Sequence, residues 1–307
     1  MQYKKGIDFV IISYTLPDLA KQCVKSIETF FKNTPKTIHI VCNYLEKEIE
    51  MSILQEIFPQ EYVKIHEGVD QSKSIARHKN SFQHNIVKIG KLDNNKTAMG
   101  SYYGAWATNI GIKEGNREYV CVLDQDSIFL EECEKELVEL SEKYCFISNR
   151  WDPGTLFKET RNTNPELGMA RPMMLFSKRE FYDDIESQKY VEKGTWSSSP
   201  YNVDWRDNCG NLTWYAQQNK KEFLILPNSY WDSRKCSRYN INKEDIKKWH
   251  RPKEEHILPL TDIDNEQCWI DEKPIHFHLG RGGHKSRPQR IKDWITITDN
   301  YLNNKTK

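Results

Sequence analysis

Two carboxylates that could bind a metal ion stand at the end of an apolar run in this chain. Residues 119–123 are apolar, and Asp124, Gln125 and Asp126 follow them directly. Hard cations such as Mg²⁺ take oxygen ligands and are commonly held by one or two carboxylates together with substrate phosphates. Aspartate is also a common N-cap residue, so the same acids could cap a helix predicted over residues 129–143. The pair therefore indicates either a metal site or a helix cap.

A second segment whose residues could bind a metal ion or an anion lies near the C-terminus. The alternation of residues 275–279 predicts a strand that places His276 and His278 on one face. Glycines in the following residues 280–283 would let backbone N–H groups approach an anion closely. Lys285 and Arg287 add cationic donors, and a neutral imidazole can bind a metal ion. We expect at least one of the two histidines to be a ligand, whereas a lone histidine would more often be structural.

Residues 195–231 are rich in aromatic side chains set among polar ones. They include four tryptophans, at positions 196, 205, 214 and 231. A sugar ring presents both C–H and hydroxyl surfaces, which suits aromatic faces beside hydrogen-bonding groups. We expect either a sugar contact by at least one of these tryptophans or ordinary packing beneath a long surface segment.

Composition limits the classes of function. The 307 residues carry a formal charge of +1, so no overall field favours nucleic acid or an anionic membrane as a partner. The eight cysteines include no Cys-x-x-Cys pair, which argues against a zinc finger or a thioredoxin-like site. The run of residues 7–12, which is apolar except for Asp8, is too short for a signal sequence or a membrane span. We expect a cytoplasmic protein with at most peripheral membrane association.

The elements that must position these residues alternate between strand and helix. Apolar patterns predict strands over residues 9–13, 37–42, 62–66, 119–123 and 144–148, and helices over residues 19–31, 47–57, 99–113 and 129–143. A further strand fits residues 168–177 and a helix fits residues 178–185. Such alternation predicts an α/β fold with a mostly parallel, doubly wound sheet, whose ligands bind at the carboxyl ends of the strands.

Several of these segments, taken in order, resemble the GT-A glycosyltransferases. Residues 10–27 resemble the family's opening strand, Thr/Tyr-containing turn and helix, and residues 40–43 resemble its second strand. Residues 107–112 are similar to the family's Ala-Arg-Asn-x-Gly helix, with Thr108 in place of the Arg. Residues 168–176 and 212–219 resemble its later strand and acceptor-side helix. The resemblance spans roughly residues 7–226 and is nearest to the inverting, family-two-like members.

The resemblance implies a mixed, mostly parallel GT-A sheet flanked by helices, and a metal-dependent sugar transfer from a nucleotide-sugar donor, a UDP- or GDP-sugar, to a glycan hydroxyl. It implies a catalytic domain over residues 1–240, with a nucleotide-sugar half of about 1–130 and an acceptor half of about 131–240, and a C-terminal segment, residues 241–307, that completes the active site. The divalent cation, Mn²⁺ or Mg²⁺, would be held by Asp126, Asp124, His278 and His276. The nucleotide sugar would contact Ser13, Tyr14, Thr15, Asn43, Asn109, Asp124, Gln125, Lys285 and Arg287.

The acceptor side follows from the same resemblance. The acceptor hydroxyl must lose its proton to a general base, and the resemblance implies that this base is a carboxylate. Asp207 is the candidate and Asp204 its rival, with Trp205 and Trp196 as acceptor contacts.

Two other functions remain open. A sugar nucleotidyltransferase should carry a Gly-rich, Arg-containing turn after the first strand, which residues 13–17 lack, and a non-catalytic glycan-binding protein could use the tryptophans without the acids.

Overall fold

The structure of the protein is a computed structural model. It describes residues 2–14, 16–42, 47–68, 104, 107–153, 168–187, 210–229, 242–249, 266–279 and 288–306. In this part of the chain no helix is both long enough and apolar enough to cross a membrane. The six cysteines that it includes are free thiols.

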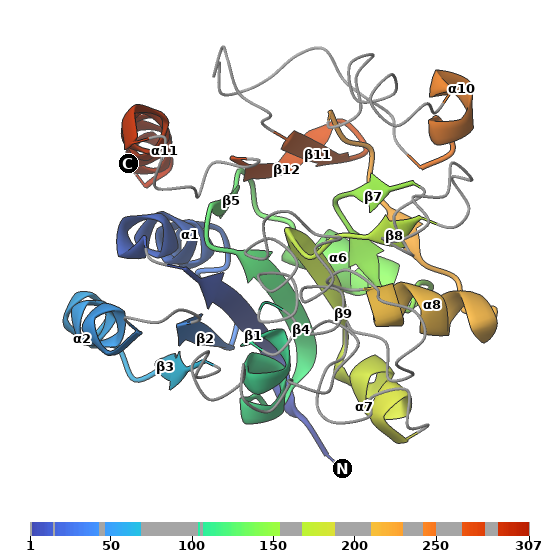
Figure 1. Cartoon of the computed structure of the whole chain (residues 1–307), viewed down its shortest axis with the longest axis horizontal. Helices are drawn as coiled ribbons and strands as arrows, with labels where there is room; N and C mark the ends of the chain where they lie inside the picture. Colours follow the sequence, from blue (N-terminus) through green and yellow to red (C-terminus); the bar gives the residue numbers. More distant parts are fainter. Residues whose placement is uncertain are drawn as a thin grey trace, which may run out of the picture.

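A seven-stranded mixed sheet forms the centre of the molecule (Figure 1). Its strand order is β10-β6-β9-β4-β1-β2-β3. The strands are β1 (Lys4–Ser13), β2 (Lys36–Cys42), β3 (Val63–Glu67), β4 (Arg117–Asp124), β6 (Ile147–Ser148), β9 (Met174–Lys178) and β10 (Leu224–Ile225). Strands β3, β2, β1 and β4 are parallel, and β9 runs antiparallel between β4 and β6. The prediction of a mixed, mostly parallel α/β sheet is confirmed.

Helices cover both faces of this sheet, because its strands are apolar on both sides. In β1, Phe9 belongs to the core cluster that includes side chains of α1, α2 and α6, whereas the next residue, Val10, belongs to the cluster that includes side chains of α7 and α8. The helices are α1 (Pro17–Phe30), α2 (Lys47–Ile57), α6 (Glu134–Ser141), α7 (Arg179–Ser187) and α8 (Gly210–Gln218). Residues 107–114 are also helical, as predicted, and Ile112 joins the second cluster. This is the doubly wound arrangement that a largely buried parallel sheet requires.

A smaller sheet of three strands lies beside the carboxyl end of β4. Its order is β11-β12-β5, formed by β11 (Glu266–Ile270), β12 (Lys273–His278) and β5 (Ser127–Phe129). Helix α11 (Pro288–Lys305) covers it, and the Trp294 ring stacks on Phe277 at a centroid distance of 4.7 Å. Figure 1 shows β11 and β12 above the end of β5, and α11 near α1. The division of the chain at residue 240 stays a prediction.

Three short elements complete the described chain. Strands β7 (Trp151–Asp152) and β8 (Met169–Ala170) form a two-stranded antiparallel ladder, and α10 (Lys243–Ile246) is a single turn of helix. Strand β8 and strand β9 occupy the region predicted as one strand over residues 168–177, which is interrupted by a turn at residues 172–173. Met173 lies in this turn, and its carbonyl accepts hydrogen bonds from the Ser127 hydroxyl at 3.0 Å and the Asp124 N–H at 3.4 Å.

Candidate metal centre

The acidic pair lies in the tight connection between two strands. Asp124 is the last residue of β4, Gln125 and Asp126 form a turn, and β5 begins at Ser127. The predicted helix over residues 129–143 was wrong in its first turn, since Phe129 pairs in a β-ladder with His276 and α6 begins only at Glu134. The cap residue of α6 is Cys133. The helix-cap interpretation of the two aspartates is therefore excluded.

Backbone pairing brings His278 to the acidic turn. His278 ends β12 and lies opposite Ser127 in the β12–β5 ladder, and the Leu279 N–H donates to the Asp126 carbonyl at 3.0 Å. The His278 Nε2 atom consequently lies 3.2 Å from Asp126 Oδ1 and 3.7 Å from Asp124 Oδ2. Two segments about 150 residues apart in the chain are thus held together by main-chain hydrogen bonds, which fix the spacing of the three side chains.

The geometry of these three side chains fits a divalent cation. One ligand atom from each of Asp124, Asp126 and His278 lies within 4.8 Å of the other two. Adjacent ligands of an octahedral ion, each about 2.1 Å from it, lie about 3.0 Å apart, and opposite ligands about 4.2 Å apart. Carboxylates suit Mg²⁺ and Mn²⁺, while imidazole is a common ligand of the transition metals, so the mixed set suits Mn²⁺. Such a set leaves further coordination positions for other oxygen ligands.

Charge is concentrated at this site. Burial raises the pKa of Asp124 to about 6, although His278 opposes the shift. Burial alone would lower the pKa of His278, but the Asp126 and Glu266 carboxylates outweigh it and raise that pKa to about 10. In the metal-free protein the imidazole is therefore protonated and itself serves as the counter-charge of the acids. The Asp124 side chain is about one third exposed (32%) while that of Asp126 is nearly covered (9%), so the site opens on the Asp124 side.

The side chain between the two aspartates faces the end of β1. Gln125 Oε1 accepts hydrogen bonds from the Tyr14 N–H at 2.8 Å and the Ser13 hydroxyl at 3.2 Å, and Gln125 Nε2 donates to the Tyr14 carbonyl at 3.0 Å. Gln125 is buried, whereas the Tyr14 side chain is half exposed (51%). The amide thus fixes the backbone that follows β1 beside the acidic turn. The assignment of these three residues to the nucleotide sugar stays a prediction.

The two histidines of β12 differ in their surroundings. They lie two residues apart on one face, as predicted, and pair with Phe129 and Ser127 of β5. His276 is fully buried and meets the Phe129 ring edge-on at a centroid distance of 6.0 Å. Burial lowers the pKa of His276 to about 3, so this side chain is neutral. Only His278 belongs to the group of described residues that could hold a cation.

Two buried charged residues at this site were missed in the sequence. Glu266 of β11 lies opposite His278 in the β11–β12 ladder, and its Oε1 atom is 3.5 Å from His278 Nδ1. Arg150 donates from Nη1 to the same Glu266 oxygen at 2.6 Å. Glu266 is the first residue of an otherwise uncharged strand, and that is the signal that could have revealed it. Its role depends on strand register, which the local sequence does not show.

The other predicted site residues divide into two groups. Asn109 is described and lies buried in the helix of residues 107–114, and its contact with a nucleotide sugar stays a prediction. The remaining ones lie outside the described residues, so their roles also stay predictions: Thr15, Asn43, Trp196, Asp204, Trp205, Asp207, Lys285 and Arg287.

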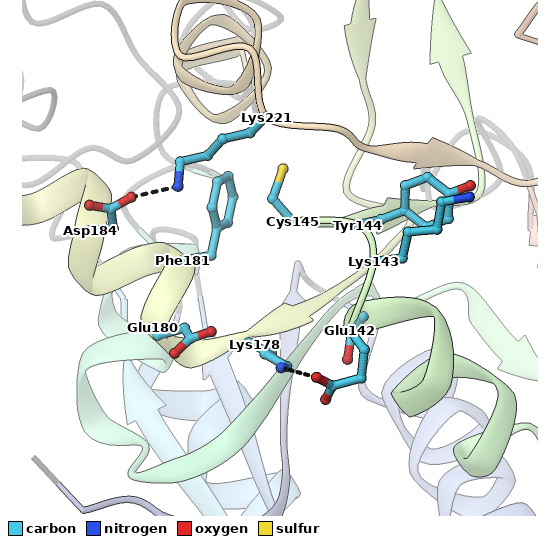
Figure 2. A pocket seen from close by; sticks show the side chains of 10 residues that line it. Glu142, Lys143, Tyr144, Cys145, Lys178, Glu180, Phe181, Asp184 and Lys221 are labelled. Carbon is cyan, nitrogen blue, oxygen red and sulfur yellow. Dashed lines mark hydrogen bonds and ion pairs between the residues drawn. The ribbon is translucent and has the colours of Figure 1, made fainter.

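A separate pocket of about 390 Å³ lies at the other end of the sheet (Figure 2). It is lined in part by Lys178 of β9, which forms an ion pair with Glu142 at 2.7 Å. Lys178 is in register with Tyr119 near the beginning of β4, five residues before Asp124. Because a strand rises about 3.3 Å per residue, this pocket is more than about 15 Å from the acidic turn. It is not part of the candidate metal centre.

Comparison with known proteins finds similar solved structures. No family model and no curated protein matches the chain. The chain is similar to the mannosyltransferase PcManGT from Pyrobaculum calidifontis in complex with GDP-Man and Mn²⁺, with 12% identity and a TM-score of 0.43 over 74% of this chain and 56% of that one. It is also similar to residues 1–349 of S. aureus TarS, with 13% identity and a TM-score of 0.35 over 59% of this chain and 49% of that one. The chain thus spans about half the length of each structure.

Proposed function

We propose that this protein is a metal-dependent glycosyltransferase that moves a sugar from a nucleotide-sugar donor to an acceptor hydroxyl. The observation that carries the proposal is the group of Asp124, Asp126 and His278 at the carboxyl end of β4. In open α/β sheets ligands bind outside this edge. A site with two carboxylates and further open coordination positions suits a cation that also binds phosphate oxygens.

The chemistry of sugar transfer explains why such a site is needed. A nucleotide sugar leaves behind a nucleoside diphosphate, whose developing negative charge a bound divalent cation neutralises as a Lewis acid. Asp126 and His278 would hold the ion from the protein side, because both are buried and fixed by the β5–β12 pairing. Asp124, more exposed, would complete the set or contact the ribose. The Gln125 amide would keep the Ser13–Tyr14 backbone beside the nucleotide.

The remaining roles come from the resemblance of the sequence alone, and they belong to residues outside the described part of the chain. Asp207, or Asp204 in its place, would remove the proton from the acceptor hydroxyl. The hydroxyl oxygen would then attack the anomeric carbon from the face opposite the leaving nucleoside diphosphate, and this single displacement inverts the configuration. Lys285 and Arg287 would contact the diphosphate, and Trp205 and Trp196 the glycan acceptor. A UDP- or GDP-sugar as donor and a cytoplasmic location belong to the same proposal.

A screen of nucleotide sugars with Mn²⁺ or Mg²⁺ tests this function. We expect release of nucleoside diphosphate from one of them, with water or a glycan as acceptor, and loss of the release in EDTA. Asp126→Asn should lower the rate at least about 100-fold, because a cation supplies several kcal/mol of charge stabilisation and each 1.36 kcal/mol is a factor of ten.

The matched control is Glu142→Gln, which removes a carboxylate at the opposite end of the sheet. This variant should retain the wild-type rate. Full metal-dependent turnover by Asp126→Asn would refute the proposed site. Pyrophosphate release from a nucleoside triphosphate and a sugar phosphate would instead indicate a nucleotidyltransferase, and glycan binding without any turnover a binding protein.

A further inference from the structure

The side of His278 that faces away from the aspartates meets a buried carboxylate. Glu266 and His278 are directly opposed residues of the β11–β12 ladder, so their side chains lie on the same face of the small sheet. The distance from His278 Nδ1 to Glu266 Oε1 is 3.5 Å, while His278 Nε2 is directed toward Asp126 at 3.2 Å. The imidazole is thus placed between a carboxylate at each ring nitrogen.

Glu266 is itself held in place by a guanidinium group. Arg150 Nη1 donates to Glu266 Oε1 at 2.6 Å, and the glutamate side chain is 1% exposed. The opposite edge of the guanidinium, Nε and Nη2, donates to both oxygens of Asp152, with Nη2 at 2.9 Å from Oδ2. The planar fork of arginine makes such two-sided binding specific in direction. Glu266 therefore cannot turn away from His278 without losing its arginine.

This arrangement is poorly explained by stability alone. A buried ion pair seldom stabilises a fold more than well-packed apolar residues of similar size, because both charges must be removed from water. The neighbouring residues of β11 are buried and uncharged, so the strand could have continued in the same way at position 266. A carboxylate at Nδ1 of a metal-binding histidine has a specific effect: it fixes the tautomer and the orientation of the ring.

We propose that Glu266, anchored by Arg150, is a positioning residue for the metal ligand His278. By accepting the Nδ1–H, Glu266 leaves the lone pair of Nε2 directed at the cation between the two aspartates, and its negative charge makes the imidazole a stronger ligand. This inference rests on the metal site of the proposed function, but it does not depend on which sugar or acceptor is used.

Mn²⁺ binding to the metal-free protein, measured by calorimetry and by electron paramagnetic resonance, tests the inference without any turnover. In Glu266→Gln the side-chain volume is kept and the charge is lost. We expect the Mn²⁺ affinity to fall about 10- to 100-fold, as for other carboxylates that orient metal-binding histidines. The matched control is Asp152→Asn, which removes the other carboxylate of the same arginine. Its Mn²⁺ affinity should stay within about twofold of wild type, since it loses a comparable ion pair but not the partner of Nδ1.

A spectroscopic readout separates positioning from general destabilisation. Electron spin echo modulation from ¹⁴N reports an imidazole nitrogen bound to Mn²⁺, and we expect it in wild type and Asp152→Asn and expect it weakened in Glu266→Gln. If Glu266→Gln does not fold, Glu266→Asp serves instead: it keeps the charge for Arg150 but is one methylene shorter, and the same losses are expected.

Two outcomes would overturn the inference, and they have different meanings. Unchanged Mn²⁺ affinity and unchanged ¹⁴N modulation in the Glu266 variant would refute the role of Glu266 while leaving the metal centre intact. Absence of Mn²⁺ binding by the wild-type protein would overturn the metal centre itself, and the positioning role with it.

Discussion

Replacing Gln125 by leucine should loosen the end of β1, at Ser13 and Tyr14. The Gln125 amide connects the acidic turn to this segment through three hydrogen bonds, two to the Tyr14 backbone and one to the Ser13 hydroxyl. Leucine has a similar size but can make none of them. The change therefore removes a polar connection between two neighbouring strand ends and leaves the packing volume nearly constant.

The structure limits the size of the effect. A typical buried hydrogen bond contributes about 1 kcal/mol net, so three bonds set an upper value of about 3 kcal/mol. Tyr14 is half exposed, and water can reach its backbone once the amide is gone. If water replaced both backbone bonds fully, only about 1 kcal/mol would remain. We expect Gln125→Leu to lower the free energy of unfolding by about 2 kcal/mol.

Urea unfolding in EDTA measures this quantity without a contribution from bound metal. Ser13→Ala is the matched control, because it removes one bond of the three and leaves the two to Tyr14; it should cost about 1 kcal/mol or less. If Gln125→Leu were no more destabilising than Ser13→Ala, the Gln125 amide would not hold the end of β1, and the prediction would be wrong.

Three further predictions concern the scaffold. Asp8→Asn should cost about 3 kcal/mol in urea unfolding, because it leaves Arg179, 2.6 Å away, as an uncompensated buried charge. Although burial opposes it, hydrogen bonds and nearby cations lower the pKa of Asp8, so this contribution is present above the usual aspartate pKa of about 4. The difference between wild type and variant should shrink as the pH falls below that value, and a constant difference would contradict the assignment. Gly111→Ala should lower the thermal stability by about 1–3 kcal/mol, since a Cβ atom there would lie 2.3 Å from a Val10 methyl; an unchanged melting temperature would argue against this close packing. Trp294→Ala should cost about 3–5 kcal/mol in denaturant, and a loss below about 1 kcal/mol would show that α11 is not firmly packed on the small sheet.

Much of the sheet could be predicted from local patterns. Helix α2 begins and ends where its apolar spacing predicts, at Lys47 and Ile57, and β2 differs from the prediction by one residue. Phe129, predicted as the first residue of a helix, was one exception, because a short apolar run fits a helix and a strand equally well. Phe129 is in a strand because β5 pairs with β12, which lies about 150 residues later in the chain. Local sequence contains no information about such a partner.

The part of the candidate site that could be predicted is the part that depends only on residue type and spacing. Asp124 and Asp126 at a strand end, and a histidine on an alternating strand, indicate metal ligands by residue type and position alone. The choice of His278 over His276 depends on strand register, and so does the contact with Glu266. Arg150 follows the short strand β6, more than about 100 residues before Glu266 and His278 in the chain. These contacts arise only when three separate segments meet.

The most direct test of the metal centre is anomalous X-ray scattering from crystals grown with Mn²⁺ and a nucleoside diphosphate. We expect one strong manganese peak about 2 Å from both Asp126 Oδ1 and His278 Nε2, with diphosphate oxygens completing its coordination on the side of Asp124. Asp126→Asn crystals prepared in the same way should lack the peak. A nucleotide bound at the carboxyl end of β4 without manganese at these residues, or manganese bound only elsewhere, would contradict the proposed metal centre.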